Sequence, residues 1–221
     1  MEVLGIDIRW LGHASFKIEK EQKIFIDPFQ LKLPEKDADL ILITHDHFDH
    51  CSIDDIKKLV NPQAVIIASK MCRSKIDNFK TQVAKILYFV SGDKVKINNA
   101  SIEAIPAYNI NKFRAPGVVF HPKEMNYLGY IVEIDKVRIY HAGDTDFIPE
   151  MSNLGRIDIA LLPIGGTYTM NVEEAVEAVK AIRPKYTIPM HYGSIVGSEK
   201  DAEKFEKLAS EYTKVIVMEK E

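Results

Sequence analysis

Three histidines and two aspartates lie within six consecutive residues, where the sequence reads H-D-H-F-D-H from position 45 to position 50. Neutral imidazole and carboxylate groups are the usual nitrogen and oxygen ligands of zinc and its neighbours. Alternate side chains of an extended segment point the same way, so His45 and His47 can reach one point. Asp49 and His50, past the bend, can reach a second. A solvated polar turn is the alternative, but three histidines packed against a strand end favour a metal site.

The segments on either side of this motif predict how it is held. Leu40 to Thr44 is short, apolar and partly β-branched, which indicates a buried strand. Residues 52–55 (Ser-Ile-Asp-Asp) resemble a capping box and predict the start of a helix. The motif is therefore expected in the loop between a strand and a helix. Cys51 could ligate a metal, but packing at the helix start is the favoured interpretation.

Two further strand ends carry groups that could bind metal. Asp144 lies in H-A-G-D-T-D after a predicted strand, and His191 lies in M-H-Y-G after another. His141 is better explained as a structural histidine. His13, in W-L-G-H-A-S-F, sits at a hairpin turn, where a role beside the metal and a role in the turn are equally well supported.

These motifs occur in an order that resembles the metallo-β-lactamase superfamily: W-L-G-H-A-S-F, T-H-D-H-F-D-H, H-A-G-D-T-D, P-I-G-G-T-Y-T-M and M-H-Y-G. The resemblance covers nearly the whole chain. It is closest to the small stand-alone metal-dependent hydrolases related to ascorbate-6-phosphate lactonase. It implies an α+β fold, a four-layer αβ/βα sandwich with two mixed sheets, in one domain spanning residues 1–221. Metals would lie along one edge, where strand ends of both halves meet.

The resemblance also implies a set of ligands. His45 and His47 would belong to one metal site, Asp49, His50 and His191 to a second, and Asp144 would bridge them. Asp49 would also be catalytic, by orienting the attacking water. The ligand set suits one or two Zn²⁺ ions in a binuclear site, and it also suits Mn²⁺, Fe²⁺ or Ni²⁺.

The sequence departs from the family pattern at one place. Relatives often carry a third histidine for the first metal just after the strand that here ends at Ala107, but this chain continues Tyr108-Asn109. His121, farther along the same loop, could replace that ligand, or Asn109 could offer an amide oxygen. The first site could also be weak or empty.

The loop from Tyr108 to Asn126 is the longest irregular stretch, and loops of this length in compact domains are often functional. We predict that it closes over the metal edge with His121 pointing into the site. Its cations, Lys112, Arg114 and Lys123, could meet a substrate phosphate or carboxylate. The alternative is a solvated loop whose charges have no role.

Other elements follow from periodicity and punctuation. Helices are expected over Ser69–Asn78 and Val172–Ile182, and a closing strand over Val215–Met218. The segment from Gly165 to Thr169 either binds an anionic substrate group through its backbone N–H groups or forms a tight strand-to-helix turn. The two alternatives are equally supported.

Composition limits the classes of function. The chain has 221 residues, 46% of them hydrophobic, and a net charge of −3, which gives no overall field for nucleic acid. It contains no apolar run of membrane-spanning length and no signal-peptide pattern at its start. Two cysteines, Cys51 and Cys72, are expected to be reduced, and a cytoplasmic location is the default.

The sequence therefore predicts a metal-dependent hydrolase that acts on a small lactone, ester or phosphoester through metal-activated water. One alternative is a nuclease or phosphodiesterase of the same superfamily, and another is a non-catalytic metal-binding protein. The expected partner is a small-molecule substrate. Neither nucleic acid nor a membrane is expected, and a homo-oligomer is left open.

Overall fold

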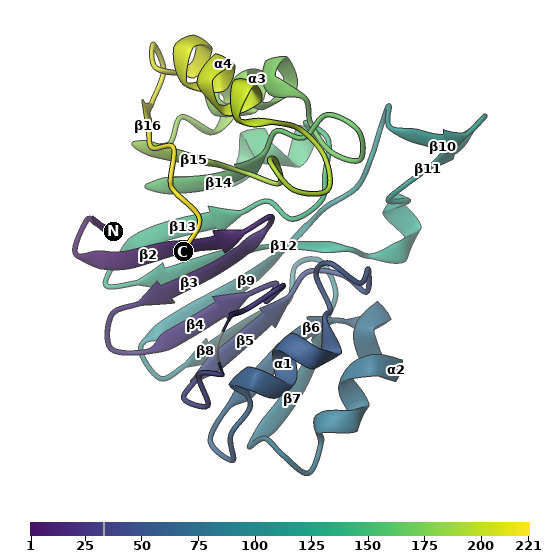
Figure 1. The fold of residues 1–221 in the computed structure, drawn as a ribbon, viewed down its shortest axis with the longest axis vertical. Coiled ribbons are helices and arrows are strands. Elements are labelled where there is room, and N and C mark those ends of the chain that lie inside the picture. The colour runs from purple at the N-terminus through teal and green to yellow at the C-terminus, as the bar shows by residue number, and fades with distance from the viewer. Residues whose placement is uncertain (33) are drawn as a thin grey trace. The chain divides into compact units, whose positions relative to one another are not determined.

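The computed structural model describes residues 1–32 and 34–221, and it divides into two compact units. The first comprises residues 1–90 with 219–221, and the second comprises residues 91–218. Each unit is built on its own seven-stranded sheet (Figure 1). One domain over residues 1–221 remains a prediction.

The sheet of the first unit follows chain order from β1 to β7. Its strands are β1 (Glu2–Val3), β2 (Ile6–Gly12), β3 (Ser15–Glu19), β4 (Lys23–Ile26), β5 (Leu40–Ile43), β6 (Val65–Ser69) and β7 (Lys85–Phe89). Neighbours are antiparallel from β1 to β4 and parallel from β4 to β7. The helical elements are α1 (Ile53–Leu59), α2 (Arg73–Ile76) and the 3₁₀ turns η1 (Lys70–Cys72) and η2 (Asp77–Phe79).

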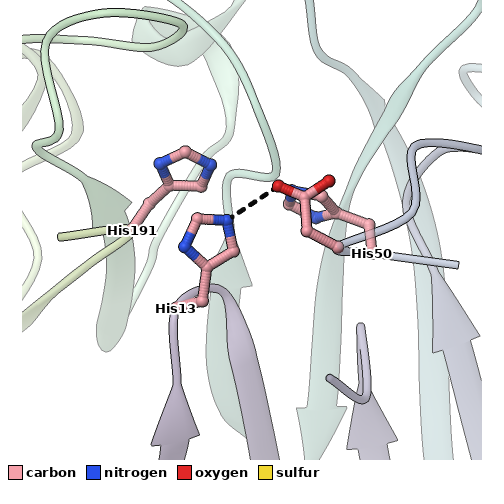
Figure 2. A group of neighbouring side chains, drawn as sticks. His13, His50 and His191 are labelled. Atoms are coloured by element: carbon pink, nitrogen blue, oxygen red, sulfur yellow. Dashed lines mark hydrogen bonds and ion pairs between the residues drawn. The ribbon is translucent and has the colours of Figure 1, made fainter. Parts of the chain in front are cut away.

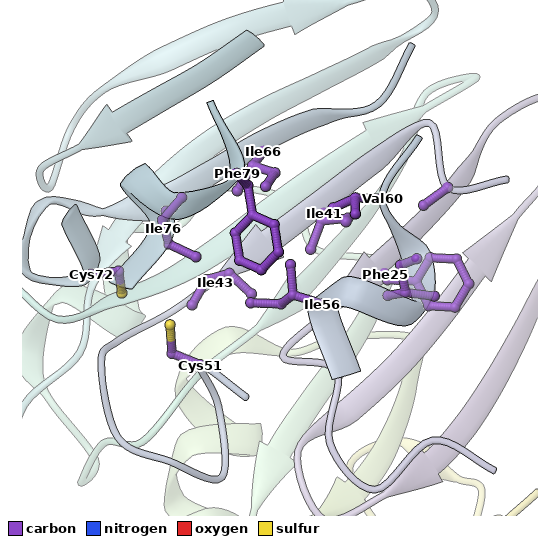
Figure 3. Close-up of a cluster of buried hydrophobic side chains, with 13 residues drawn as sticks. Phe25, Ile41, Ile43, Cys51, Ile56, Val60, Ile66, Cys72, Ile76 and Phe79 are labelled. Atoms are coloured by element: carbon purple, nitrogen blue, oxygen red, sulfur yellow. The ribbon is translucent and has the colours of Figure 1, made fainter. Parts of the chain in front are cut away.

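A buried apolar cluster joins β5 and β6 to these helices (Figure 3). Ile41 and Ile43 point from β5 toward Ile56 of α1, and Phe79 of η2 packs in the same cluster. All four side chains are fully or almost fully buried. Because β5 is anchored in this way, the loop that follows it starts from a fixed strand end.

The sheet of the second unit has the order β16-β15-β14-β13-β12-β9-β8. Its strands are β8 (Lys94–Ile97), β9 (Ala100–Pro106), β12 (Leu128–Ile134), β13 (Val137–His141), β14 (Ile159–Pro163), β15 (Tyr186–Met190) and β16 (Lys214–Val215). The other elements are β10 (Phe113–Ala115), β11 (Val118–Val119), η3 (Lys123–Met125), η4 (Pro149–Asn153), α3 (Val172–Ile182) and α4 (Glu199–Ala209).

The two sheets repeat one pairing pattern. In the second unit, neighbours are antiparallel from β8 through β9 and β12 to β13, and parallel from β13 to β16. The first unit shows the same sequence of three antiparallel and three parallel pairings. The motif at residues 45–50, Asp144 and His191 follow the carboxyl ends of β5, β13 and β15, each in the parallel part of its sheet, which is where open α/β sheets bind their ligands. His121 lies instead in the loop after the antiparallel strand β9.

Three predicted elements differ in detail. Residues 69–78 do not form one helix, because their hydrogen bonding alternates between the 3₁₀ and α patterns, although Cys72 and Ile76 are buried at helical spacing. The loop from Tyr108 to Asn126 contains the hairpin β10–β11. The closing strand, β16, ends at Val215. Among the described residues, no helix has the length and apolar character needed to cross a membrane.

Candidate metal centre

The H-D-H-F-D-H motif forms a tight loop between β5 and α1 in the first unit, as the sequence predicts. The backbone carbonyl of His47 accepts hydrogen bonds from the N–H groups of His50 and Cys51, at 3.2 and 2.8 Å. Ser52 caps α1 by accepting from the N–H of Asp55. The loop is therefore closed by its own backbone, which holds its side chains at the end of β5.

One buried carboxylate orients two of the histidines. Asp27, which follows β4, accepts a hydrogen bond from Nδ1 of His50 at 2.7 Å and one from the hydroxyl of Thr44 at 2.6 Å. That hydroxyl lies 3.0 Å from Nδ1 of His45. Since its hydrogen goes to Asp27, the hydroxyl accepts from the His45 ring. Both imidazoles therefore carry their proton on Nδ1 and present Nε2 as the ligand atom.

His45 and His47 converge as predicted. Nε2 of His45 lies 3.0 Å from Nδ1 of His47. Two nitrogen ligands of a tetrahedral zinc with bonds of about 2.0–2.1 Å lie about 3.3 Å apart, so this spacing fits a shared ion after a small adjustment. The ring centroids of His45 and His50 are 4.0 Å apart, which gathers three imidazoles in one place.

Asp49 lies beside this group and is held by His13. Oδ2 of Asp49 is 3.0 Å from Nε2 of His13 and 3.9 Å from Nε2 of His50. Figure 2 shows His13 at the end of its strand, with the dashed line marking this ion pair, and His50 nearby. Of the two alternatives for His13, contact with the motif is therefore the one observed. His13 and Asp27 have φ values of 53° and 45°, in the left-handed region that polar residues enter at a cost.

A second ligand group lies in the other unit. Oδ2 of Asp144, after β13, is 3.2 Å from Nε2 of His191, which follows β15, and 3.5 Å from Nε2 of His121. All three side chains are almost completely buried. His191 has a φ of 59°, and a Cβ on Gly165 would clash with the carbonyl oxygen of His191. Gly165 therefore provides the space for this backbone approach.

Asn109 and His121, the two candidates for the missing third ligand, contact each other. Oδ1 of Asn109 accepts from the backbone N–H of His121 at 2.8 Å and lies 2.9 Å from its Nδ1. His121 therefore carries its proton on Nδ1 and turns Nε2 toward the Asp144 carboxylate. Two acceptors in this position are stable only with a cation or a proton near both. Asn109 thus orients His121, and its amide nitrogen donates to Oδ1 of Asp146 at 3.0 Å.

The cations of the long loop hold the loop in place. The ammonium group of Lys112 donates to both carboxylate oxygens of Glu174, at 2.8 and 2.6 Å. Lys123 donates to Glu150 at 2.9 Å and to the hydroxyl of Tyr108 at 3.2 Å. Both ammonium groups already pair with carboxylates, and the expectation that they meet a substrate anion stays a prediction. Arg114 remains exposed.

The segment from Gly165 to Thr169 and His141 both make local hydrogen bonds. Gly166 N–H donates to the carbonyl of Met170, and Asn171 caps α3 in a capping box with Glu174, which favours the turn over an anion site. The N–H of Gly143 donates to Nδ1 of His141, a structural role.

Cys51 packs in the apolar cluster of the first unit rather than among the histidines (Figure 3). Its thiol forms a hydrogen bond with that of Cys72, and this bond, together with burial, raises the pKa of Cys72. Both cysteines are free, as the sequence predicts.

Sequence reasoning missed Asp27, Thr44 and the orienting role of Asn109. The Asp27-Pro28 pair directly after β4 was a signal that could have indicated Asp27, because a carboxylate at the end of a buried strand needs hydrogen-bond partners. The residues present fit a metal: their donors are neutral imidazoles and carboxylates, and hydrogen bonds to Asp27, Thr44 and Asn109 orient the imidazole rings, as is usual for ligating histidines.

The chain belongs to the β-lactamase superfamily, whose domain model matches residues 7–191. A UPF0173 metal-dependent hydrolase of Pyrococcus furiosus is 35% identical over 96% of this chain and 96% of the relative. The corresponding protein of Thermococcus kodakarensis is 35% identical over 97% and 96%.

Solved structures agree with this assignment. A protein from Parabacteroides distasonis superposes with a TM-score of 0.82 at 33% identity, covering 98% of this chain and 94% of that one. Igni18, a metallo hydrolase from Ignicoccus hospitalis, gives 0.77 at 27% identity, covering 97% and 95%. The α+β metallo-β-lactamase fold expected from the sequence is confirmed. The narrower resemblance to ascorbate-6-phosphate lactonase stays a prediction.

Proposed function

We propose that the protein is a metal-dependent hydrolase that cleaves a small lactone, ester or phosphoester. The observation that carries the proposal is the oriented histidine group, in which Asp27 fixes His50 directly and His45 through Thr44. Such support is typical of ligating histidines and unnecessary for a polar turn. Family membership and the names of the relatives support the same class.

The proposed ligands are those predicted from the sequence. His45, His47, Asp49 and His50 come from the first unit, and His121, Asp144 and His191 come from the second. Zn²⁺ is the expected ion, one or two per chain, with Mn²⁺, Fe²⁺ and Ni²⁺ as alternatives. A bound ion would supply a water of lowered pKa and would polarise the carbonyl or phosphoryl oxygen of the substrate.

The residues of the chain have separate roles in this proposal. Asp49 orients the attacking water and takes up its proton, while His13, 3.0 Å away, fixes which way the carboxylate points. Asp27 and Thr44 keep His50 and His45 in the tautomer that can bind metal. Asn109 does the same for His121.

The test combines metal content with turnover. Chelator-stripped protein is titrated with zinc and with manganese, metal is counted by elemental analysis, and each form is assayed on a panel of lactones, carboxylic esters and phosphodiesters. We expect one or two ions per chain and turnover that requires them. Absence of stoichiometric metal would refute the proposal. Metal without turnover would favour the non-catalytic alternative, and turnover of phosphodiesters alone would favour the nuclease.

A further inference from the structure

Phe48 stands out within the metal-binding loop. It lies between His47 and Asp49, and 67% of its surface is exposed, the largest exposed fraction among the large hydrophobic side chains of the described residues. Isolated exposed apolar side chains are common on protein surfaces and need no explanation. Phe48, however, is not isolated. Its ring contacts that of Phe29 edge to face, with centroids 5.9 Å apart.

This aromatic pair continues into the candidate ligands. The Phe29 ring lies 5.9 Å from that of His13, and the His13 ring lies 5.6 Å from that of His50. All three spacings, including that of Phe29 and Phe48, are typical of contacting aromatic rings. An unbroken row of rings therefore leads from the exposed face of Phe48 to the imidazole of His50.

The backbone explains why Phe29 occupies this place. Asp27, Pro28 and Phe29 follow β4, and the left-handed φ of Asp27, 45°, turns the chain there. One turn therefore places the Asp27 carboxylate against His50 and, two residues later, the Phe29 ring against His13. The orientation of a proposed ligand and the position of the aromatic pair come from the same local structure.

One cation beside the motif is already engaged. In the first unit, Lys75 donates to the backbone carbonyl of Asp46. An exposed phenyl ring beside the proposed ligands provides apolar area.

We propose that Phe48 and Phe29 form an apolar wall that binds an aryl or alkyl group of the substrate, and that the substrate is an ester or lactone of an apolar carboxylic acid. This inference rests on the proposed hydrolase function. In the reaction, the acyl–oxygen bond breaks, the oxygen of water joins the acyl carbon, and the departing oxygen takes a proton. The products are the carboxylic acid and an alcohol, or one hydroxy acid from a lactone.

Binding of product-like acids tests the wall without requiring turnover. Calorimetry on zinc-loaded protein compares 3-phenylpropanoate with propanoate, which differ only in the ring. We expect the phenyl compound to bind about tenfold more tightly, and Phe48→Ala to reduce that preference by about two- to tenfold. Phe48→Tyr, which keeps the ring, should restore it. Met71→Ala removes another exposed apolar side chain of the same unit and should leave the preference unchanged.

Hydrolysis of the matched methyl esters of the two acids separates this inference from the proposed function. The apolar wall is overturned if the wild type binds both acids with equal affinity. It is also overturned if Phe48→Ala and Met71→Ala reduce the preference for the phenyl compound equally. If both esters are hydrolysed with equal KM, the hydrolase stands and the wall does not. If the ring-dependent binding is present but no ester or lactone is cleaved, the wall stands and the proposed hydrolase function fails.

Discussion

The carboxylate of Asp27 and the imidazole of His50 form a hydrogen bond of 2.7 Å, and both side chains are fully buried. The two residues are 23 positions apart, and they follow neighbouring parallel strands, β4 and β5. Thr44 donates to the same carboxylate from its backbone and from its hydroxyl. A single acid therefore connects the ends of two strands and fixes the face of the loop that we propose binds metal.

Replacing this acid should weaken metal binding without removing a ligand. Asp27→Asn keeps the size of the side chain, but its one carbonyl oxygen cannot accept all three bonds from His50, the Thr44 hydroxyl and the Thr44 N–H, which involve both carboxylate oxygens. We expect zinc affinity to fall by about 10–100-fold, the range for partners of ligating histidines. Competition with a chromophoric chelator measures the change.

Asp39→Asn is the matched control for this experiment. Asp39 lies in the same unit and accepts from the backbone N–H of Lys23 at 2.7 Å, a bond that an asparagine oxygen can also accept. The control should bind zinc as the wild type does. If Asp27→Asn also binds zinc with unchanged affinity, Asp27 does not orient the ligands.

Asp49 should be required for turnover. Asp49→Ala removes the carboxylate that we propose to orient water, and general-base groups typically contribute 10²–10⁴-fold in rate. We therefore expect kcat to fall by at least about 100-fold on any ester or lactone that the panel identifies, with the fold retained by circular dichroism.

Asp54→Ala controls for loss of an acid in the same stretch. Asp54 lies in the first turn of α1, where it pairs with Lys57 and 89% of its side chain is exposed. We expect this variant to retain its activity. Near-normal kcat in Asp49→Ala would contradict the role of Asp49 in water activation.

The sequence was sufficient for the elements that depend on local pattern. The strand before the motif, the capped helix after it and the convergence of His45 with His47 follow from periodicity and spacing. The partners of these groups were harder to predict. Asp27 meets His50 only because β4 and β5 pair in parallel, and Asn109 meets His121 across a loop of 12 residues. Hydrogen bonds between distant positions leave no periodic signal in a single sequence.

The same reason applies to the lysines of the long loop. A cation in a long loop of unknown path can face either a substrate or another part of the protein. Glu174 was expected in the predicted helix, but nothing in the sequence places it against Lys112. The structure does so by bringing the loop to the first turn of α3, where the capping box also holds Glu174.

His121 and Asn109 should behave as one unit. His121→Ala and Asn109→Ala should each weaken zinc binding, by about tenfold or more, because one removes a proposed ligand and the other releases its ring. Since the two act through the same bond, the double variant should lose little more than His121→Ala alone. Zinc titration of the two single variants and the double variant gives the coupling free energy between Asn109 and His121.

Arg114→Ala is the control from the same loop, because Arg114 is exposed and lies on the hairpin strand β10. The Arg114→Ala variant should bind zinc with the same affinity as the wild type. Fully additive losses for His121→Ala and Asn109→Ala would show that Asn109 does not act through His121. A raised KM with unchanged metal binding in His121→Ala would make it a substrate contact instead.

The anchor of the long loop should make stability depend on pH. Burial raises the pKa of Glu174, but hydrogen bonds from Lys112, Asn111 and the Asn171 N–H more than offset this and hold the pKa below its usual 4.5. A depressed carboxyl pKa stabilises the fold above the pKa of the unfolded chain. The contribution is lost as pH falls from about 4.5 through the lower pKa of the folded state.

Glu174→Gln isolates this contribution, because glutamine can still form the capping box with Asn171 while the charge opposite Lys112 is removed. We expect the variant to be about 1 kcal/mol less stable than the wild type at pH 7. The difference should shrink as pH falls below about 4.5. Urea unfolding at pH 7, 5.5 and 4 measures this difference.

Glu177→Gln is the control, because it breaks an exposed pair with Lys180 on the same helix. It should change the free energy of unfolding by less than about 0.5 kcal/mol at every pH. A difference for Glu174→Gln that is constant from pH 7 to 4 would exclude the ion pair as its source.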